Sequence, residues 1–246
     1  MSILKSVSLN IMSIKGIFPI HKWDFNTESI LADLPPVDFE LLTCNKIEHP
    51  YKKGEVVFKE GSYPSGIFFI NYGKVKKYRV DELGREQIIY VANKGELIGY
   101  HAILSGDSYP DSATTLEVSN IAFIPKEDFL KTLEQSSILN HRLLKTLSHE
   151  FAVLANSLTL FSQKSVRERL ALHLIVVREK YKVDFQPGME VEINMSRDDL
   201  AGLVGTAREN VVRVLSEFKK DGILETKGRK IFIKDISRLI SIANYK

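Results

Sequence analysis

Residues 196–220 read SRDDLAGLVGTARENVVRVLSEFKK, and this stretch decides how the C-terminal part of the chain folds. Two helix starts of the capping-box type lie ten residues apart: Ser196 is followed by Asp199, and Thr206 by Glu209. In such a box a hydroxyl and an acidic side chain satisfy the free N–H groups of a first helical turn. The glycine before Thr206 supplies the turn, because positive φ is easiest without a Cβ. The pattern predicts a helix-turn-helix whose second helix begins near Thr206.

The predicted second helix has one apolar and one polar face. The residues expected to be buried are Val211, Val214, Leu215 and Phe218. The outer face, near the N-terminal end, carries Arg208, Glu209, Val212 and Arg213. In a DNA major groove, arginines at this end can reach guanine O6 and N7, and a carboxylate can accept from cytosine N4. Val212 is either partly buried or a thymine-methyl contact. The alternative is a solvated face in which Glu209 serves only as a cap.

A β-hairpin is predicted directly after this helix. Asp221-Gly222 ends the helix, and Ile223–Thr226 and Lys230–Ile233 can pair as a wing. Cations at a wing tip and polar groups at helix N-termini hold DNA phosphates. The expected phosphate contacts are therefore Ser196, Arg197, Thr206, Lys227, Arg229 and Lys230. A plain hairpin with solvated charges is the alternative.

Residues 53–125 have a different texture. Glycines recur between short runs rich in β-branched and aromatic residues, which indicates an antiparallel barrel or sandwich. The predicted strands are Glu55–Phe58, Gly66–Ile70, Lys74–Val80, Gln87–Val91 and Asn120–Ile124. We see no helical period between them, and we expect one short helix upstream, within residues 36–50.

A long helix is predicted from about Ser136, after a shorter one at Lys126–Leu133. Its apolar residues recur at spacings of 3, 4, 3, 4 and 3: Leu144, Leu147, Phe151, Leu154, Leu158 and Phe161. This heptad seam favours pairing with the same helix of a second copy. The alternative is packing on the chain's own barrel. Leu143, Val153 and Leu160 widen the stripe enough to serve both surfaces. Further along, Ser165–Lys182 is expected to be helical, Lys182–Glu190 a loop, and Val191–Asn194 a strand.

Charge and cysteine content narrow the function classes. Residues 161–246 hold 17 Lys and Arg against 12 Asp and Glu, whereas the other 160 residues hold 17 against 19. A basic C-terminal third is typical of a part that faces phosphate. The single cysteine, Cys44, excludes an intramolecular disulfide, a four-cysteine zinc site and an iron–sulfur cluster. Without a signal peptide or membrane span in the sequence, we expect a cytoplasmic protein with no membrane partner.

With residues 196–224 and the stretch KGEVVFKEGSYPSGIFFINYGKVKKY at 53–78, the chain resembles the CRP/FNR family of bacterial regulators. The resemblance implies an α+β fold: an N-terminal, cupin-like antiparallel β-roll, a long dimerisation helix and a C-terminal winged helix-turn-helix. The expected division is a leader (1–35), the β-roll sensor (36–135), the dimerisation helix (136–163) and the DNA-binding domain (164–246). A homodimer would bind double-stranded DNA at a two-fold operator. By position, Arg208, Glu209 and Arg213 match the base-reading residues of catabolite-activator-like members.

The sensor pocket departs from the family pattern. The resemblance places the effector pocket at Gly95, Glu96, Leu97, Gly99, Tyr100, His101, Asp111 and Ser112, with Leu154 and Ala155 on the long helix. In members that bind cyclic AMP, a glutamate stands at the position of Tyr100 and an arginine at that of Asp111. An aspartate repels a phosphate, so we do not expect cyclic AMP to be the effector. A different, unidentified small-molecule effector is expected, and a regulator without an effector is the alternative.

Other cofactors and activities are less favoured. The cysteine cluster of oxygen-sensing members is missing. His101 and His49 are the candidate haem ligands, but neither has a second potential ligand at a suitable spacing in the sequence. A cupin-type metal enzyme needs clustered histidines, and the six histidines contain no His-x-His. We therefore predict no catalytic residues, no metal site and no cofactor. A contact between the 182–190 loop and RNA polymerase is left open.

Overall fold

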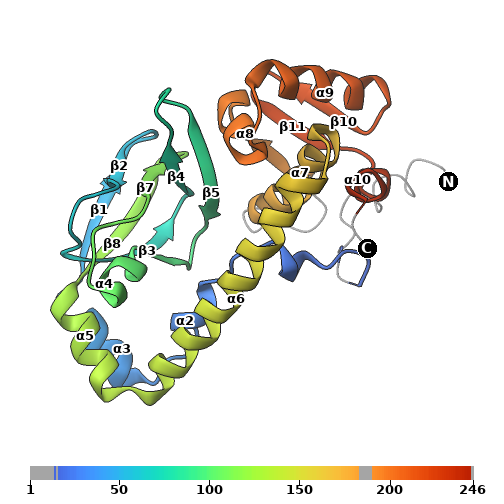
Figure 1. Ribbon diagram of the computed structural model, residues 1–246. Helices are drawn as coiled ribbons and strands as arrows, with labels where there is room; N and C mark the ends of the chain where they lie inside the picture. Colours follow the sequence, from blue (N-terminus) through green and yellow to red (C-terminus); the bar gives the residue numbers. More distant parts are fainter. Residues whose placement is uncertain (1–13, 15, 183–189, 245–246) are drawn as a thin grey trace. The chain divides into compact units, whose positions relative to one another are not determined.

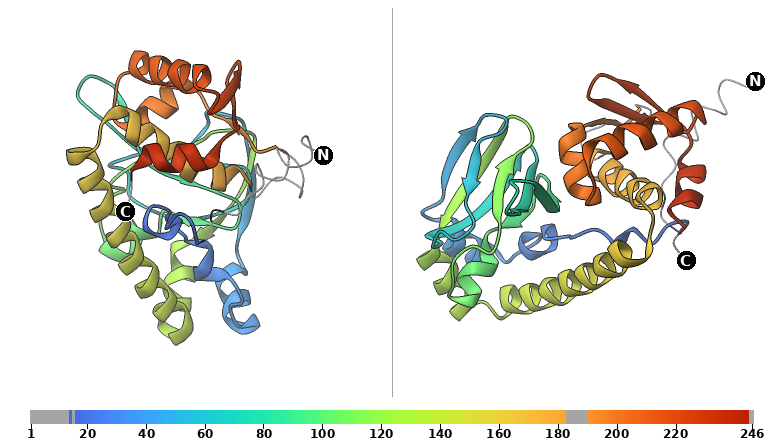
Figure 2. Two further views of the ribbon diagram at one scale, coloured as in Figure 1. Left: turned by 90° about the vertical axis from the view of Figure 1, so that its right-hand side faces the viewer. Right: turned by 45° about the horizontal axis from the view of Figure 1, so that its top comes forward.

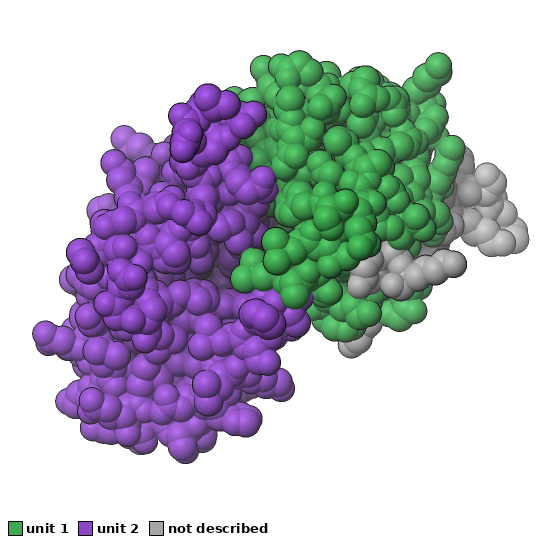
Figure 3. Space-filling view, in the orientation of Figure 1, with its two compact units in different colours: residues 1–24, 154–246 green, residues 25–153 purple. Residues whose placement is uncertain are grey.

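The structure is a computed structural model that describes residues 14, 16–182 and 190–244 (Figure 1, Figure 2). The chain forms two compact units (Figure 3). One comprises residues 25–153, and the other combines residues 154–246 with the start of the chain, up to residue 24.

Two four-stranded antiparallel sheets form the centre of the 25–153 unit. One has the strand order β1-β8-β3-β6 and the other β2-β7-β4-β5. The strands are β1 (Ile47–Tyr51), β2 (Val56–Phe58), β3 (Gly66–Tyr72), β4 (Val75–Val80), β5 (Glu86–Ala92), β6 (Leu97–Ile98), β7 (Ser112–Thr115) and β8 (Ser119–Pro125). Phe58, Phe68, Val75 and Ala113 from the two sheets share one buried cluster, so the core lies between the sheets. The antiparallel β-roll expected from the sequence is confirmed.

The helices of this unit are α2 (Glu28–Leu31), α3 (Pro36–Thr43), α4 (Tyr100–Ser105), α5 (Lys126–Gln135) and most of α6 (Ser137–Gln163). The prediction of a helix within 36–50 holds only for α3, since residues 47–51 form the strand β1. That strand contains Pro50 and lies at the edge of its sheet, where a residue without an N–H is tolerated. The prediction of no helix between residues 53 and 125 was wrong. Helix α4 is a six-residue helix set between two left-handed glycines, Gly99 and Gly106, and is too short to display a helical period.

Helix α6 carries two different apolar stripes. Leu143 and Val153 are buried and belong to the core clusters of the roll. The heptad seam lies beside this stripe and is largely open: Leu144 is 68% exposed, Phe151 74% and Leu158 73%. Leu154 and Phe161 are also exposed, whereas Leu147 packs partly against the roll. The widened stripe therefore supplies a face for the roll and leaves a second apolar face uncovered.

The second unit is built around a three-stranded antiparallel sheet of order β10-β11-β9. Its elements are α7 (Val166–Lys182), β9 (Glu192–Asn194), α8 (Arg197–Val204), α9 (Arg208–Lys220), β10 (Leu224–Lys227), β11 (Lys230–Ile233) and α10 (Ile236–Ala243). The predicted hairpin is present, with β9 as an additional strand. Residues 183–189 of the predicted loop lie outside the described residues.

Part of the expected leader packs into this second unit. Ile14, Phe18 and Trp23 are buried, and η1 (Ile20–Lys22) is a short 3-10 helix. An ion pair of 3.0 Å joins Asp24 to Lys180 of α7. The other predicted leader residues that the structure describes, from Phe25 onward, belong to the roll unit, while residues 1–13 and 15 lie outside the described part.

Candidate functional site: a DNA-recognition face and a polar sensor pocket

Helix α8 begins and ends as the sequence predicts. Ser196 is its N-cap, and the hydroxyl accepts from the N–H of Asp199 at 3.0 Å. The helix ends at Gly205, whose φ of 64° is left-handed. The amides of Gly205 and Thr206 both donate to the carbonyl of Ala201, and Ala201 is buried. The turn that orients the next helix is therefore fixed by backbone hydrogen bonds.

Helix α9 starts two residues later than expected. Its N-cap is Ala207, which has extended backbone and makes no side-chain cap. The predicted capping box at Thr206 and Glu209 does not form. The Thr206 hydroxyl accepts instead from the side-chain Nδ2 of Asn210 at 3.1 Å. The predicted inner face is confirmed, because Val211, Val214, Leu215 and Phe218 are all buried.

The four predicted base readers lie together on the outer face of α9. Arg208, Glu209, Val212 and Arg213 are all exposed. Val212 is 44% exposed, so it is partly buried and still presents its methyl groups to the solvent. Arg208 lies 3.6 Å from the carboxylate of Asp198 on α8. The first two turns of α9 thus present two guanidinium groups, a carboxylate and an apolar side chain to the solvent.

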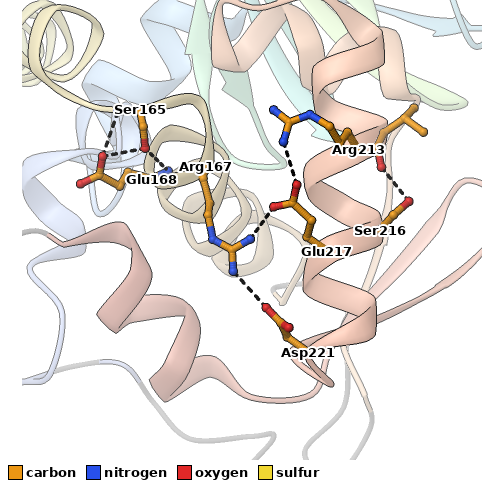
Figure 4. A network of polar contacts seen from close by, with 8 residues as sticks. Ser165, Arg167, Glu168, Arg213, Ser216, Glu217 and Asp221 are labelled. Carbon is orange, nitrogen blue, oxygen red and sulfur yellow. Dashed lines mark hydrogen bonds and ion pairs between the residues drawn. The ribbon is translucent and has the colours of Figure 1, made fainter.

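Arg213 belongs to a network that the sequence did not suggest (Figure 4). Its Nη1 donates to Oε1 of Glu217 at 2.7 Å, and Oε2 of the same carboxylate accepts from Nη1 of Arg167 at 2.7 Å. Arg167, at the start of α7, also donates to Asp221 at 3.0 Å. Its guanidinium lies over the ring of Phe218, 4.6 Å from the centroid.

The wing carries the three predicted cations, and two of them also contact other side chains of the same unit. Lys227, Arg229 and Lys230 are exposed at or next to the hairpin turn. Lys230 pairs with Glu192 of β9 at 2.9 Å, and the ammonium of Lys227 lies 5.8 Å from the ring centroid of Phe232. Arg197 donates to the carbonyl oxygens of Gly228 and Arg229 at 3.1 and 3.2 Å. Its half-buried guanidinium has a pKa lowered by desolvation. Arg197 thus fastens the wing turn to the start of α8.

The region where the family resemblance predicts an effector pocket contains a buried ion pair. Asp111 precedes β7, and its Oδ2 lies 3.0 Å from Nζ of Lys77 on β4. Both residues are buried, so each charge is compensated by the other rather than by water. The neighbouring Ser112 hydroxyl accepts from the amide of Glu60 at 3.0 Å. The carboxylate of Asp111 is therefore committed to a partner within the roll.

A second buried cluster joins α4 to α6. The phenol of Tyr100 donates to Oε1 of Glu150 at 2.7 Å, and Nε2 of His101 lies 2.7 Å from Oε2. Glu150 is only 5% exposed. Burial alone would raise the pKa of Glu150, but the hydrogen bond and charge of His101, the bond from Tyr100 and the charge of Lys77 together hold it below its usual value. Burial, followed by the charge of Glu150, raises the pKa of Tyr100 strongly.

The other residues predicted to line the effector pocket contact the roll itself or lie exposed on α6. The carboxylate of Glu96 accepts from the amide of Asn93 at 3.2 Å and from the hydroxyl of Thr27 at 3.4 Å. Gly95 has a φ of 85°, and Leu97 is fully buried. Leu154 and Ala155 are exposed on α6. His49, the other histidine considered for haem, packs edge-on against Tyr51.

The sequence did contain a signal for Glu150. Leu143, Thr146, Glu150 and Val153 recur at helical spacing and are all buried, so a carboxylate interrupts the stripe that faces the roll. No comparable signal exists for Lys77, which lies in a strand rich in basic residues. Among the described residues, no three or more His, Cys, Asp and Glu side chains are grouped so that they could hold a metal ion.

Comparison with known proteins adds the family. Residues 48–136 match the cyclic nucleotide-binding domain, and residues 168–242 match the Crp-like helix-turn-helix domain. The fumarate and nitrate reduction regulatory protein of Vibrio cholerae is 30% identical over 194 residues, which cover 79% of this chain and 77% of that protein. The chain belongs to the CRP/FNR family of transcription regulators. The transcriptional activator protein anr of Pseudomonas aeruginosa is 28% identical over 79% of each chain.

Solved structures agree on the fold of this CRP/FNR regulator. FixK2 of Bradyrhizobium japonicum has a TM-score of 0.71 at 22% identity, covering 82% of this chain and 98% of FixK2. A CRP/FNR-family regulator of Eubacterium rectale has a TM-score of 0.69 at 20% identity, covering 87% and 96%. The family comprises DNA-binding transcription regulators rather than enzymes, and dimerisation is typical of it. No helix in the described part of the chain is long and apolar enough to cross a membrane.

We predict that Glu150→Gln destabilises the roll unit and flattens its response to acid. The variant keeps the shape of the side chain but loses the charge that His101 and Tyr100 contact, so the free energy of unfolding should fall by about 1–3 kcal/mol at neutral pH. Because the pKa of Glu150 is lowered by folding, its stabilisation is present above the ordinary carboxyl pKa and is lost as the pH falls through the folded value. Urea unfolding followed by circular dichroism between about pH 7 and pH 3 should therefore show a steeper loss in the wild type than in the variant.

Glu48→Gln is the matched control. Glu48 forms an exposed pair with Lys46, and exposed pairs contribute about 0–1 kcal/mol. Equal effects of the two substitutions at neutral pH would contradict a structural role for the buried carboxylate.

Proposed function

We propose that this CRP/FNR regulator reads a two-fold symmetric operator through Arg208, Glu209 and Arg213. The observation that carries the proposal is the outer face of α9, where these three side chains are exposed together at the N-terminal end. A guanidinium can donate two parallel hydrogen bonds to guanine O6 and N7, and a carboxylate can accept from cytosine N4. Val212 is exposed beside them and is suited to a thymine methyl.

Phosphate contacts would frame this base-reading face. Ser196 and Thr206 lie just before the two helices, and Lys227, Arg229 and Lys230 lie at the wing turn. Groups of this kind fix the register of a protein on the duplex without reading sequence. The position of Arg197 supports a different role. Its guanidinium holds the wing turn, so it would order these contacts rather than make one itself.

We expect in vitro selection from random duplexes to return a two-fold motif with G-rich half-sites about one helical turn apart. Arg208→Ala should lower affinity for the selected duplex by about tenfold or more and relax the preference at one base pair in each half-site. Binding can be measured by fluorescence anisotropy at fixed salt.

Lys220→Ala is the control for this substitution. Lys220 is exposed at the far end of the same helix, so its loss should weaken all duplexes similarly. The proposed reading fails if selection returns no motif, or if Arg208→Ala leaves both motif and affinity unchanged.

We further propose that α6 pairs with α6 of a second copy. The support is the heptad seam, in which Leu144, Phe151 and Leu158 are more than two-thirds exposed. A row of large apolar side chains on a soluble helix favours burial against a partner, and heptad spacing suits an equivalent helix. Two copies related by a two-fold axis would present two α9 helices to a two-fold operator.

Phe151→Glu should convert the dimer to a monomer in analytical ultracentrifugation, because two carboxylates would face each other across the seam. Affinity for the two-fold duplex should fall with it. Ala152→Glu provides the control, since Ala152 is exposed about one-third of a helical turn away from Phe151, on the side away from the seam. If Phe151→Glu remains dimeric, the proposed pairing through the heptad seam is wrong.

Finally, we propose that cyclic AMP is not the effector, and that any effector is a different small molecule. The buried pair of Asp111 and Lys77 supports this: a cyclic phosphate entering here would have to break the pair and meet a carboxylate. His101 is likewise committed to Glu150, which disfavours a haem ligand there.

Saturating cyclic AMP should change neither the melting temperature of the wild type nor its affinity for the selected duplex. Asp111→Asn removes the carboxylate that pairs with Lys77 at 3.0 Å, and this variant should gain thermal stability from cyclic AMP or inorganic phosphate. Stabilisation of the wild type by cyclic AMP would overturn the proposal.

A further inference from the structure

Arg213 is held from behind by a carboxylate that is itself held (Figure 4). The two oxygens of Glu217 divide between two arginines: Oε1 accepts from Arg213 and Oε2 from Arg167, each at 2.7 Å. A single ion pair between residues four apart on an exposed helix contributes little to stability, because both charged groups also hydrogen-bond to water. Here the second arginine comes from another helix, so the carboxylate has a fixed direction.

Arg167 is anchored by three different contacts. Besides Glu217 it donates to Asp221 at 3.0 Å, and its guanidinium lies 4.6 Å from the ring centroid of the buried Phe218. A planar guanidinium that donates to two carboxylates and lies over an aromatic ring has little rotational freedom. The chain of contacts therefore runs from the first turn of α7 to the outer face of α9.

The contact with Glu217 uses Nη1 of Arg213, one of the five N–H donors of a guanidinium. A guanine edge requires two neighbouring donors, and the other four are not used by this ion pair. An arginine whose orientation is set before binding loses less conformational freedom when it meets the base. It is also less able to turn aside to a phosphate, a contact that carries no sequence information.

We infer that Glu217, oriented by Arg167, is a positioning residue that sets the base specificity of Arg213. The inference rests on the proposed base-reading role of Arg213. It assigns sequence discrimination to two residues that, on this account, need not contact DNA themselves.

The test uses the full-length protein and the duplex that the wild type selects, together with the three duplexes that carry the other base pairs at the position read by Arg213. That position is identified as the one where Arg213→Ala loses its preference. Glu217→Gln should lower discrimination there by about tenfold, the size expected when a two-donor contact is lost. Its affinity for an unrelated duplex should not fall, because the substitution removes a negative charge near phosphate.

Two further variants make the result specific. Glu225→Gln removes the same charge from an exposed wing residue that pairs with Lys234, and it should leave discrimination unchanged. Arg167→Lys keeps the positive charge but loses the planar fork, and it should reduce discrimination in the same direction as Glu217→Gln. Thermal unfolding verifies that each variant is folded.

The outcomes distinguish a failure of the positioning role of Glu217 from a failure of the base-reading role of Arg213. If folded Glu217→Gln and Arg167→Lys both keep wild-type discrimination while Arg213→Ala loses it, the positioning role is refuted and the proposed function stands. If Arg213→Ala loses no preference at any position, the assignment of Arg213 as a base reader is wrong, and the inference falls with it.

Discussion

The hydrogen-bonded carboxylate of Glu150 is the buried polar contact that joins the long helix α6 to the roll unit. It lies on the stripe of α6 that faces the roll, and it receives Tyr100 and His101 from the short helix α4. An ionised group in this position is tolerated only because its partners compensate for lost hydration. A helix held by a directional polar contact, rather than by apolar packing alone, has one preferred rotation about its axis. That rotation turns the heptad seam away from the roll and leaves it uncovered.

The two ends of the chain relate differently to the family pattern. On α9 the residues at the predicted base-reading positions are of the expected types and are exposed. In the roll, an ion pair between Lys77 and Asp111 stands in the region that the family resemblance assigns to an effector. Opposite charges that neutralise each other do not attract an ionic ligand. On the proposed function, departures from the family pattern in this region would change the effector without changing the contacts with DNA.

Local sequence patterns predicted most of the fold, whereas contacts between residues far apart in the sequence could not be predicted from them. The heptad seam, the left-handed Gly205 and the buried face of α9 each depend on residues within a few positions of one another, and the sequence displays them directly. The predicted start of α9 was wrong because the Thr206–Glu209 pattern looks like the Ser196–Asp199 capping box. In the structure Ser196 is an N-cap, whereas Ala207, and not Thr206, is the N-cap of α9. Arg167 and Glu217 are 50 residues apart, and Lys77 and Asp111 meet across paired strands. No spacing rule in one sequence reports such pairs, although the acidic residue in the buried stripe of α6 was a visible anomaly.

Arg197 has a geometrical consequence for the contacts with a bound duplex. Its guanidinium joins the start of α8 to the turn of the wing through two carbonyl oxygens. The wing turn and the N-terminus of α8 are therefore joined by a direct side-chain contact, which restricts the distance between the polar groups that they carry. In the proposed complex, these polar groups would contact two phosphates at a set spacing along the DNA backbone, independently of the base sequence.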